Sequence, residues 1–253
     1  MLDSLNRGLE IMKYIVINRC ASVSEIAQVF DINKSTASRI LSVLASHNLI
    51  SKDEKTMKYY SSVGTLLFSA RTMSTSLILD ELRPLLRTLA EAVNMTAQVG
   101  VFKQGGVFLI DQVKSASNRF LKEPAFPGME EPLHCTALGK CVLAYMPEEQ
   151  TAALMKDYVY TKYTDATITC IDQLNAEMEL IRQNGYARDM GEYSAKVYCM
   201  AVPVYDKDGG VKFSLGVSGN RLYLENERVF QQVLKKVQKT SEQINGKYSA
   251  SDI

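Results

Sequence analysis

The sequence GYARDMGE occupies residues 185–192, and the sequence CMAVPV follows at residues 199–204. A second, unrelated pattern, KSTASRIL, lies far upstream at residues 34–41. The upstream pattern is typical of the helix that reads DNA in a helix-turn-helix, and the downstream pattern is typical of a sensor domain. Together they predict two functional parts in one chain, and each pattern alone would be a weaker signal.

Length and composition indicate a globular protein. The chain has 253 residues, 46% of them hydrophobic and 23% charged, which leaves room for one large or two ordinary domains. No segment approaches the roughly 18 uncharged apolar residues of a membrane span, and the first residues lack the basic and apolar blocks of a signal peptide. We therefore expect a cytoplasmic protein that does not associate with membranes.

The chemistry of the side chains excludes several classes of site. Five cysteines occur without any CxxC pair, which argues against a disulfide framework and a structural zinc site and favours reduced thiols. No Walker or dinucleotide fingerprint appears, so we expect no cofactor. The net charge of only +1 means that any nucleic-acid contact must come from a local basic patch.

The N-terminal third predicts three short helices. The first is indicated by apolar residues at helical spacing, namely Leu5, Leu9, Met12 and Val16. Ser22 and Glu25 form a capping box for the second helix. Asn33 is a good N-cap for the third, whose apolar positions are Ala37, Ile40, Leu41 and Leu44.

The opposite face of the third helix suits DNA. It carries Lys34, Ser35, Thr36, Ser38, Arg39 and Ser42. Short hydroxyl side chains leave a helix thin enough for the major groove, while Lys34 and Arg39 can reach phosphates or guanine edges. An ordinary solvated helix face would have a similar composition, so this surface alone does not decide the function.

A hairpin after the third helix favours the DNA-binding interpretation. Residues 49–52 and 58–61 alternate as two strands around the charged turn DEKTM, where a winged helix-turn-helix has its wing. Lys52, Lys55 and Lys58 would then face the DNA backbone and supply the salt-sensitive part of the affinity. The prediction is a winged helix-turn-helix over residues 1–62.

Residues 63–76 are uncapped and only partly amphipathic, which suits a linker helix packed against a partner chain. Its apolar positions include Leu66, Leu67, Ala70 and Met73. A strong helix follows from Leu82 to Val93, and Pro84 would be accommodated most easily near its first turn.

The remainder, residues 77–253, predicts an α+β domain. Strands at 96–102 and 107–113 form one hairpin, and strands at 199–205 and 211–217 form another. Helical stretches are expected at 135–146, 147–157, 172–184 and 225–245. Hairpins with flanking helices indicate an antiparallel sheet layered on helices.

Cysteine and histidine chemistry leaves alternatives open. His134, Asp189 and Cys199 could form a nucleophilic or metal site, yet nothing local supplies an adjacent base or an oxyanion donor pair. A lone histidine at the start of a helix is more often structural, so we expect neither an enzyme nor a metal site. A redox sensor acting through Cys199 remains an alternative function.

The chain resembles the IclR family of bacterial transcriptional regulators over essentially its whole length. The resemblance rests on KSTASRIL at 34–41, PLHCTALGK at 132–140, and the signature Gly185, Asp189, Glu192 and Cys199. The sequence TDATIT at residues 164–169 adds a shorter agreement. Jointly these patterns are very specific.

The resemblance implies a winged helix-turn-helix, a linker helix and a GAF-like effector domain in a homodimer, which in this family often pairs into a tetramer. Such a protein binds a double-stranded operator and a small organic molecule. The family's effector contacts carry over to Ala137, Leu138, Asp189, Cys199 and Ser218. Two positions depart from the family pattern: Gly216 stands where serine is frequent, and Ser62-Val63 replaces the usual Leu-Gly.

The nature of the expected effector follows from helix electrostatics. Backbone N–H groups at the start of the 135–146 helix, with the positive end of its dipole, form an anion site that needs no basic side chain. We therefore expect a small carboxylic acid, with Phe120, Phe126 and Tyr193 as candidates for an apolar wall. Its binding would shift the occupancy of a pseudo-palindromic operator.

Overall fold

The computed structural model describes residues 2–68, 77–116 and 125–249. The chain divides into two compact units, Met1–Thr75 and Ser76–Ile253. The predicted α+β class is confirmed, because the first unit is a winged helix-turn-helix and the second is an antiparallel sheet with helices on its faces.

The three predicted N-terminal helices are present as α1 (Leu2–Asn18), α2 (Val23–Val29) and α3 (Lys34–Ser46). Both predicted caps are confirmed. The Ser22 hydroxyl accepts from the Glu25 N–H at 3.2 Å, and the Glu25 carboxylate accepts from the Ser22 N–H at 2.7 Å. Asn33 accepts from the Thr36 N–H at 2.7 Å, which fixes the start of α3.

The fully buried residues of α1 are not among the apolar residues whose spacing indicated this helix. Leu5, Leu9 and Val16 are exposed, whereas Ile11 and Ile15 are fully buried against α2 and α3. Both sides of this helix are apolar, so periodicity correctly predicted a helix but could not choose its buried side. The consequence is a helix with an exposed apolar face.

The predicted wing is also present, as strands β2 (Ile50–Lys52) and β3 (Tyr59–Ser61). Asp53 holds the turn between them, because its carboxylate accepts from the N–H groups of Lys55 at 2.7 Å and Thr56 at 3.0 Å. A third strand, β1 (Cys20–Ala21), pairs with β3. A two-residue strand carries no periodicity, and the sequence did not reveal it.

The segment after the wing begins a helical stretch. A 3-10 turn, η1 (Val63–Thr65), is anchored by the Gly64 N–H, which donates to the Asn48 carbonyl at 3.1 Å. Residues 66–68 continue as helix. Ala70 and Met73, which the linker prediction also included, lie outside the described residues.

The second unit contains a six-stranded antiparallel sheet in the order β6-β5-β4-β9-β8-β7. Its strands are β4 (Thr96–Lys103), β5 (Gly106–Lys114), β6 (Glu130–Glu131), β7 (Ala187–Met190), β8 (Val197–Tyr205) and β9 (Val211–Asn220). Both predicted hairpins are confirmed as β4-β5 and β8-β9. The short strands β6 and β7 lie at the two opposite edges.

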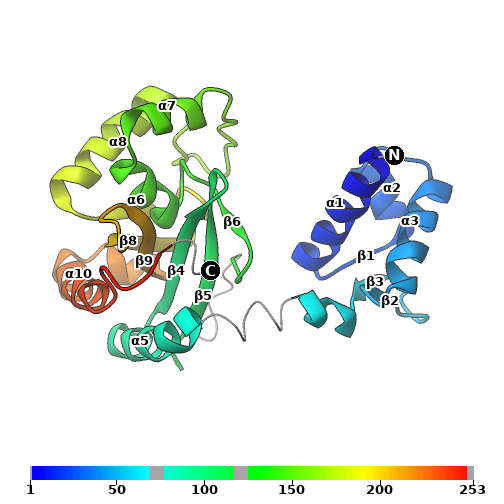
Figure 1. The fold of residues 1–253 in the computed structure, drawn as a ribbon, viewed down its shortest axis with the longest axis horizontal. Helices are drawn as coiled ribbons and strands as arrows, with labels where there is room; N and C mark the ends of the chain where they lie inside the picture. The colour runs from blue at the N-terminus through cyan, green and yellow to red at the C-terminus, as the bar shows by residue number, and fades with distance from the viewer. Residues whose placement is uncertain (1, 69–76, 117–124, 250–253) are drawn as a thin grey trace. The chain divides into compact units, whose positions relative to one another are not determined.

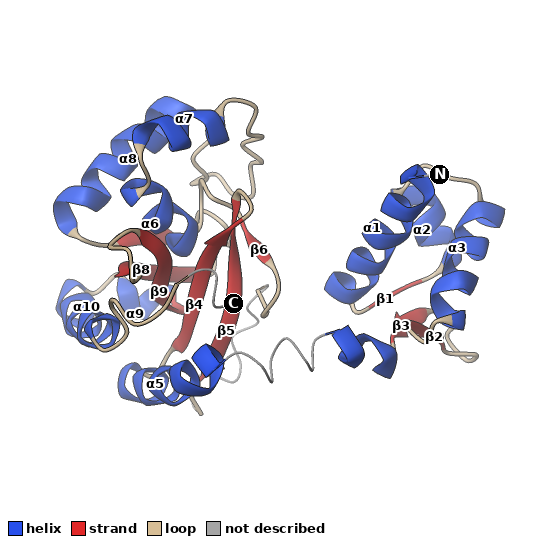
Figure 2. Cartoon of the chain, viewed as in Figure 1, coloured by secondary structure: helices blue, strands red, loops and turns tan. Residues whose placement is uncertain are grey.

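Helices cover both faces of this sheet (Figures 1 and 2). They are α5 (Leu77–Val93), α6 (Ala137–Tyr145), α7 (Glu148–Met155), α8 (Ile171–Asn184), α9 (Arg221–Leu224) and α10 (Glu227–Glu242). One apolar core joins α5 and α10 to one face, through residues such as Val99, Met200 and Leu215. A second core joins α6 and α8 to the other face.

Pro84 lies in the interior of α5 rather than near its first turn. A proline there deprives the Asp80 carbonyl of its helical donor, but Asp80 is exposed to water, which lowers the cost. The Pro84 carbonyl itself accepts from the Thr88 hydroxyl at 3.0 Å. Burial of Leu82 and Leu86 on either side holds the helix together.

Within the described ranges, every helix is too short or too polar to cross a membrane.

Candidate functional site

Polar and small side chains form a row across one face of the sheet in the second unit. Asp189 pairs with Cys199, Cys199 pairs with Ser218, and Ser218 pairs with Thr96. Residues that pair directly across strands point to the same face. The next row on this face continues the pattern with Gln98 and Gly216, so a polar floor lies beneath α6.

The helix above this floor is buried almost throughout. Thr136 caps α6, because its hydroxyl accepts from the Gly139 N–H at 3.1 Å and donates to the Pro132 carbonyl at 2.9 Å. Ala137 and Leu138 carry the first N–H groups of the helix, and among the described residues neither group has a protein acceptor. Such first-turn N–H groups favour an anion.

A cavity of about 30 Å³ separates the floor from the start of α6. Its lining residues are Gln98, Ala125, Glu131, Thr136, Ala137, Leu138, Asp189, Tyr193, Ser194, Val197, Cys199 and Ser218. We call this cavity the α6 pocket. It draws side chains from β4, β6, β7, β8 and β9, including both edges of the sheet.

All five residues that the sequence nominated for effector binding line the α6 pocket. Of the three aromatic candidates, Tyr193 lines it, Phe126 lies outside the lining, and Phe120 falls outside the described residues. Gly216 brings no donor to the floor. A Cβ there would lie 2.6 Å from the Met200 carbonyl oxygen and 3.2 Å from a Leu138 methyl, so a serine would require the neighbouring strand to shift.

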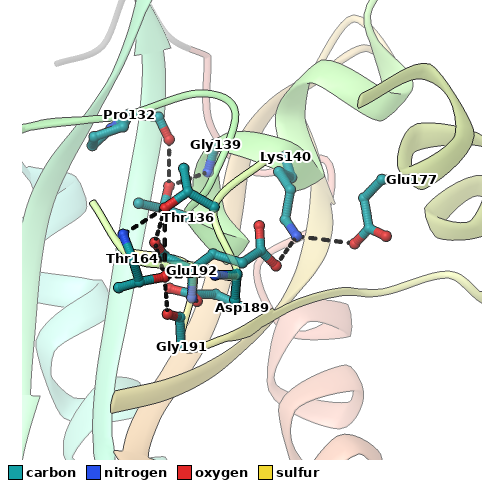
Figure 3. Close-up of polar contacts among 11 residues, drawn as sticks. Pro132, Thr136, Gly139, Lys140, Thr164, Glu177, Asp189, Gly191 and Glu192 are labelled. Atoms are coloured by element: carbon teal, nitrogen blue, oxygen red, sulfur yellow. Dashed lines mark hydrogen bonds and ion pairs between the residues drawn. The ribbon is translucent and has the colours of Figure 1, made fainter. Parts of the chain in front are cut away.

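A buried ion-pair network lies one turn further along α6. Lys140 is fully buried, and its ammonium contacts Glu192 at 2.5 Å and Glu177 of α8 at 3.0 Å, as Figure 3 shows. Burial alone would lower the pKa of Lys140, but the two adjacent carboxylates outweigh it and raise the pKa. Lys140 therefore stays charged and joins α6, α8 and the loop after β7.

The loop after β7 is held by hydroxyl groups from a distant segment. Gly191 adopts a left-handed conformation with φ of 87° and turns the chain there. Thr164 donates to the Gly191 carbonyl at 2.8 Å (Figure 3). Thr167 donates to the Glu192 carbonyl at 2.7 Å. These bonds give the TDATIT segment a physical role.

Two carboxyl groups face the α6 pocket. Burial raises the pKa of Asp189 to about 6, although the Glu192 N–H, which donates to its carboxylate at 2.6 Å, and Lys140 act in the opposite direction. Burial raises the pKa of Glu131 to about 7, opposed by the Thr136 hydroxyl. The sequence reasoning missed Glu131 and the role of Lys140. An acidic residue directly before the PLHCTALGK motif was the available signal.

His134 and the buried thiols are structural. One ring nitrogen of His134 lies 2.8 Å from the Tyr158 hydroxyl and the other lies 3.0 Å from the Thr161 carbonyl, so both are occupied. Burial lowers the pKa of His134 and raises the pKa of the Cys135 and Cys141 thiols. The described part of the chain has no cluster of three His, Cys, Asp or Glu residues suited to a metal ion.

In the first unit, the side chains nominated for DNA are accessible. Lys34, Ser35, Arg39 and Ser42 are exposed on α3, whereas Thr36 and Ser38 are half-buried. On the wing, Lys55 is exposed, and Lys52 and Lys58 are half-buried. Lys52 lies 3.4 Å from Glu54 and Lys58 lies 4.0 Å from Glu25, both weak surface pairs that leave these lysines available.

These two units define a two-part DNA-binding regulator, and comparison with known proteins identifies its family. Residues 70–246 match the bacterial transcriptional regulator IclR C-terminal domain, and residues 4–54 match the IclR helix-turn-helix domain. The chain belongs to the IclR family of transcriptional regulators. It is a DNA-binding regulator and not an enzyme.

Relatives of the same kind match along most of their length. The HTH-type transcriptional regulator BhcR of Paracoccus denitrificans is 28% identical over 90% of this chain and 81% of its own. The HTH-type transcriptional repressor AllR of Escherichia coli is 26% identical over 91% of this chain and 84% of its own. The structure of IclR from Thermotoga maritima is 25% identical, with a TM-score of 0.72, covering 96% of this chain and 98% of that one.

The Lys140 network yields a stability prediction. Replacing Lys140 by Met leaves Glu192 buried without its counter-ion, and we expect a loss of about 3–5 kcal/mol in the free energy of unfolding. Urea unfolding followed by circular dichroism measures it. Lys196→Met is the control, since Lys196 is exposed on the same loop and its loss should cost less than about 0.5 kcal/mol. Equal stability of the two variants would contradict the role given to Lys140.

Proposed function

We propose that this regulator binds a pseudo-palindromic operator as a homodimer and that a small organic acid in the α6 pocket changes the occupancy of that operator. The winged helix-turn-helix of residues 1–62 would contact DNA, residues 63–76 would link, and residues 77–253 would sense. The observation that carries the proposal is a buried polar pocket at a helix N-terminus, in a chain whose other unit has the fold of a DNA reader. Because its target is operator DNA, the regulator would act in the cytoplasm.

The mechanism rests on differential affinity. An effector changes operator occupancy only if it binds one arrangement of the DNA-binding heads better than another. Repression is the proposed output, as the name of the relative AllR states for that protein. In this family type the dimer would also be the unit that pairs into a tetramer.

The pocket supports an acid as the ligand. The N–H groups of Ala137 and Leu138 suit a carboxylate, Ser218 and Cys199 form the floor, and Asp189 would take a ligand hydroxyl. The half-buried Cys199 leaves space that a larger side chain would fill.

Substitutions in α3 and in the wing are expected to have different effects on operator binding. Arg39 projects from the exposed face of α3, so Arg39→Ala should cost about 1–3 kcal/mol on the cognate operator and relax base preference if its contact is bidentate. Lys58→Ala on the wing should weaken binding to all sequences alike and reduce the salt slope by about one unit. Fluorescence anisotropy on matched and scrambled operators separates the two. Equal loss of discrimination in both variants would contradict this division.

Dimerisation is expected to involve the segment after the wing. Leu66, Leu67 and Phe68 are 61%, 78% and 68% exposed, an unusual cluster for solvated helix. Leu67→Asp should shift the sedimentation equilibrium toward monomer and lower operator affinity by about tenfold or more, although Leu67 contacts no DNA. Leu180→Asp, at an exposed leucine of the other unit, is the control. A Leu67→Asp protein that remains dimeric and binds normally would refute the assignment.

Effector binding can be separated from thiol chemistry at one position. Cys199→Leu should fill the α6 pocket and abolish the thermal shift given by the most stabilising acid of a small-carboxylate panel, while operator binding persists. Cys199→Ser keeps the size and removes the thiol, so it should retain the response. A Cys199→Ser protein that binds the operator but no longer responds would instead support redox sensing. Cys170→Leu, at an exposed cysteine, controls for added bulk.

A further inference from the structure

The α6 pocket has an unbalanced charge. Glu131 and Asp189 reach it from the two opposite edges of the sheet and are only 5% and 3% exposed. None of its described lining residues is Lys, Arg or His. A carboxylate effector would therefore add a negative charge beside two buried acids, and burying uncompensated charge is costly.

The two acids differ in their partners. Asp189 accepts from the Glu192 N–H at 2.6 Å and has the Lys140 ammonium nearby, so its charge is already partly compensated. Among the described residues, the Thr136 hydroxyl is the polar neighbour that counteracts the burial of Glu131, and it already donates to the Pro132 carbonyl at 2.9 Å. No described basic side chain lies within ion-pair distance of Glu131. Glu131 is thus a buried carboxyl at the pocket with a vacant acceptor capacity.

We propose that Glu131 binds the ammonium group of the effector, which is therefore a small amino acid. The ligand carboxylate would meet the N–H groups of Ala137 and Leu138, and its ammonium would meet Glu131. This rests on the proposed function, because it assigns a ligand class to the same pocket. Glu131 is then the residue that distinguishes an amino acid from a hydroxy acid or keto acid of the same skeleton.

Chemistry favours an ammonium over a hydroxyl at this position. A hydroxyl donates one hydrogen bond and leaves the charge of Glu131 uncompensated, whereas an ammonium supplies three donors and a full opposite charge. Hydrogen bonds between ionised partners are roughly twice as strong as neutral ones. A zwitterion also brings no net charge into the pocket, which a plain carboxylate does.

The pH dependence has a defined sign. Tyr193 and Cys135 face Glu131 as neutral groups near neutral pH, Thr136 contacts it, and Asp189 with Lys140 lies across the pocket. Burial raises the pKa of Glu131 to about 7, and an ammonium binds its ionised form. Affinity for an amino acid should thus rise by up to about tenfold between pH 6 and pH 8. A keto acid should show the opposite trend, because it favours protonated Glu131.

The first experiment uses the wild-type full-length chain. The proteinogenic amino acids are screened by thermal shift, and the most stabilising one is compared by calorimetry with the α-hydroxy and α-keto acids of the same skeleton. We expect the amino acid to bind at least tenfold more tightly. The inference is overturned if no amino acid binds, or if the hydroxy or keto acid binds as tightly. Tight binding of a keto acid would still leave the small-acid function standing, whereas exclusive binding of ligands without a carboxylate would overturn both.

A matched pair of variants tests the residue itself. Glu131→Gln should lower the affinity for the amino acid at least tenfold and change the affinity for the hydroxy acid less than threefold. It should also remove the rise in amino-acid affinity between pH 6 and pH 8. Glu130→Gln, its exposed neighbour on β6, should change none of these. If Glu131→Gln lowers the affinities for the amino acid and the hydroxy acid equally, Glu131 has a merely structural role and the assignment is overturned. The wild-type comparison decides the ligand class even if this variant folds poorly.

Discussion

The buried ammonium of Lys140 is the contact on which the sensing unit depends. It joins α6, α8 and the loop after β7. An unpaired charge at a fully buried position costs several kcal/mol, so none of the three elements can move away alone. The first turn of α6, and with it the pocket-facing N–H groups, is consequently held at a fixed height above the sheet.

The two faces of the sheet in the second unit differ in the polarity of their side chains. The face toward α5 and α10 carries branched apolar side chains, which supply non-directional stabilisation in proportion to the area that they bury. The face toward α6 carries Thr96, Gln98, Ser218 and Asp189, which need partners in particular directions. Successive residues of a strand point to opposite sides of the sheet. Each strand can therefore supply apolar side chains to one face and polar side chains to the other.

The sequence predicts those structural features that depend on residues close together in the chain. Caps such as Ser22 and Asn33, and the β4-β5 and β8-β9 hairpins, follow from residues close in the chain and were predicted correctly. The buried side of α1 was not predicted, because both of its faces are apolar and only tertiary packing selects Ile11 and Ile15. Glu131 was not predicted, because its burial and its place across the pocket from Asp189 depend on the pairing of strands that are distant in the sequence.

The arrangement of charge along α6 explains how one short helix can serve both stability and recognition. Its N–H groups at Ala137 and Leu138 face the pocket, while Lys140, within the same turn, has its charge fully compensated by Glu192 and Glu177. Among the described residues, that ammonium forms ion pairs with these two carboxylates and not with Glu131. Among the described residues that line the α6 pocket, positive charge comes only from the start of α6, which favours a carboxylate. If the proposed amino acid binds there, its ammonium would compensate Glu131, and its two charges would have to match the spacing between helix and sheet that Lys140 helps to hold.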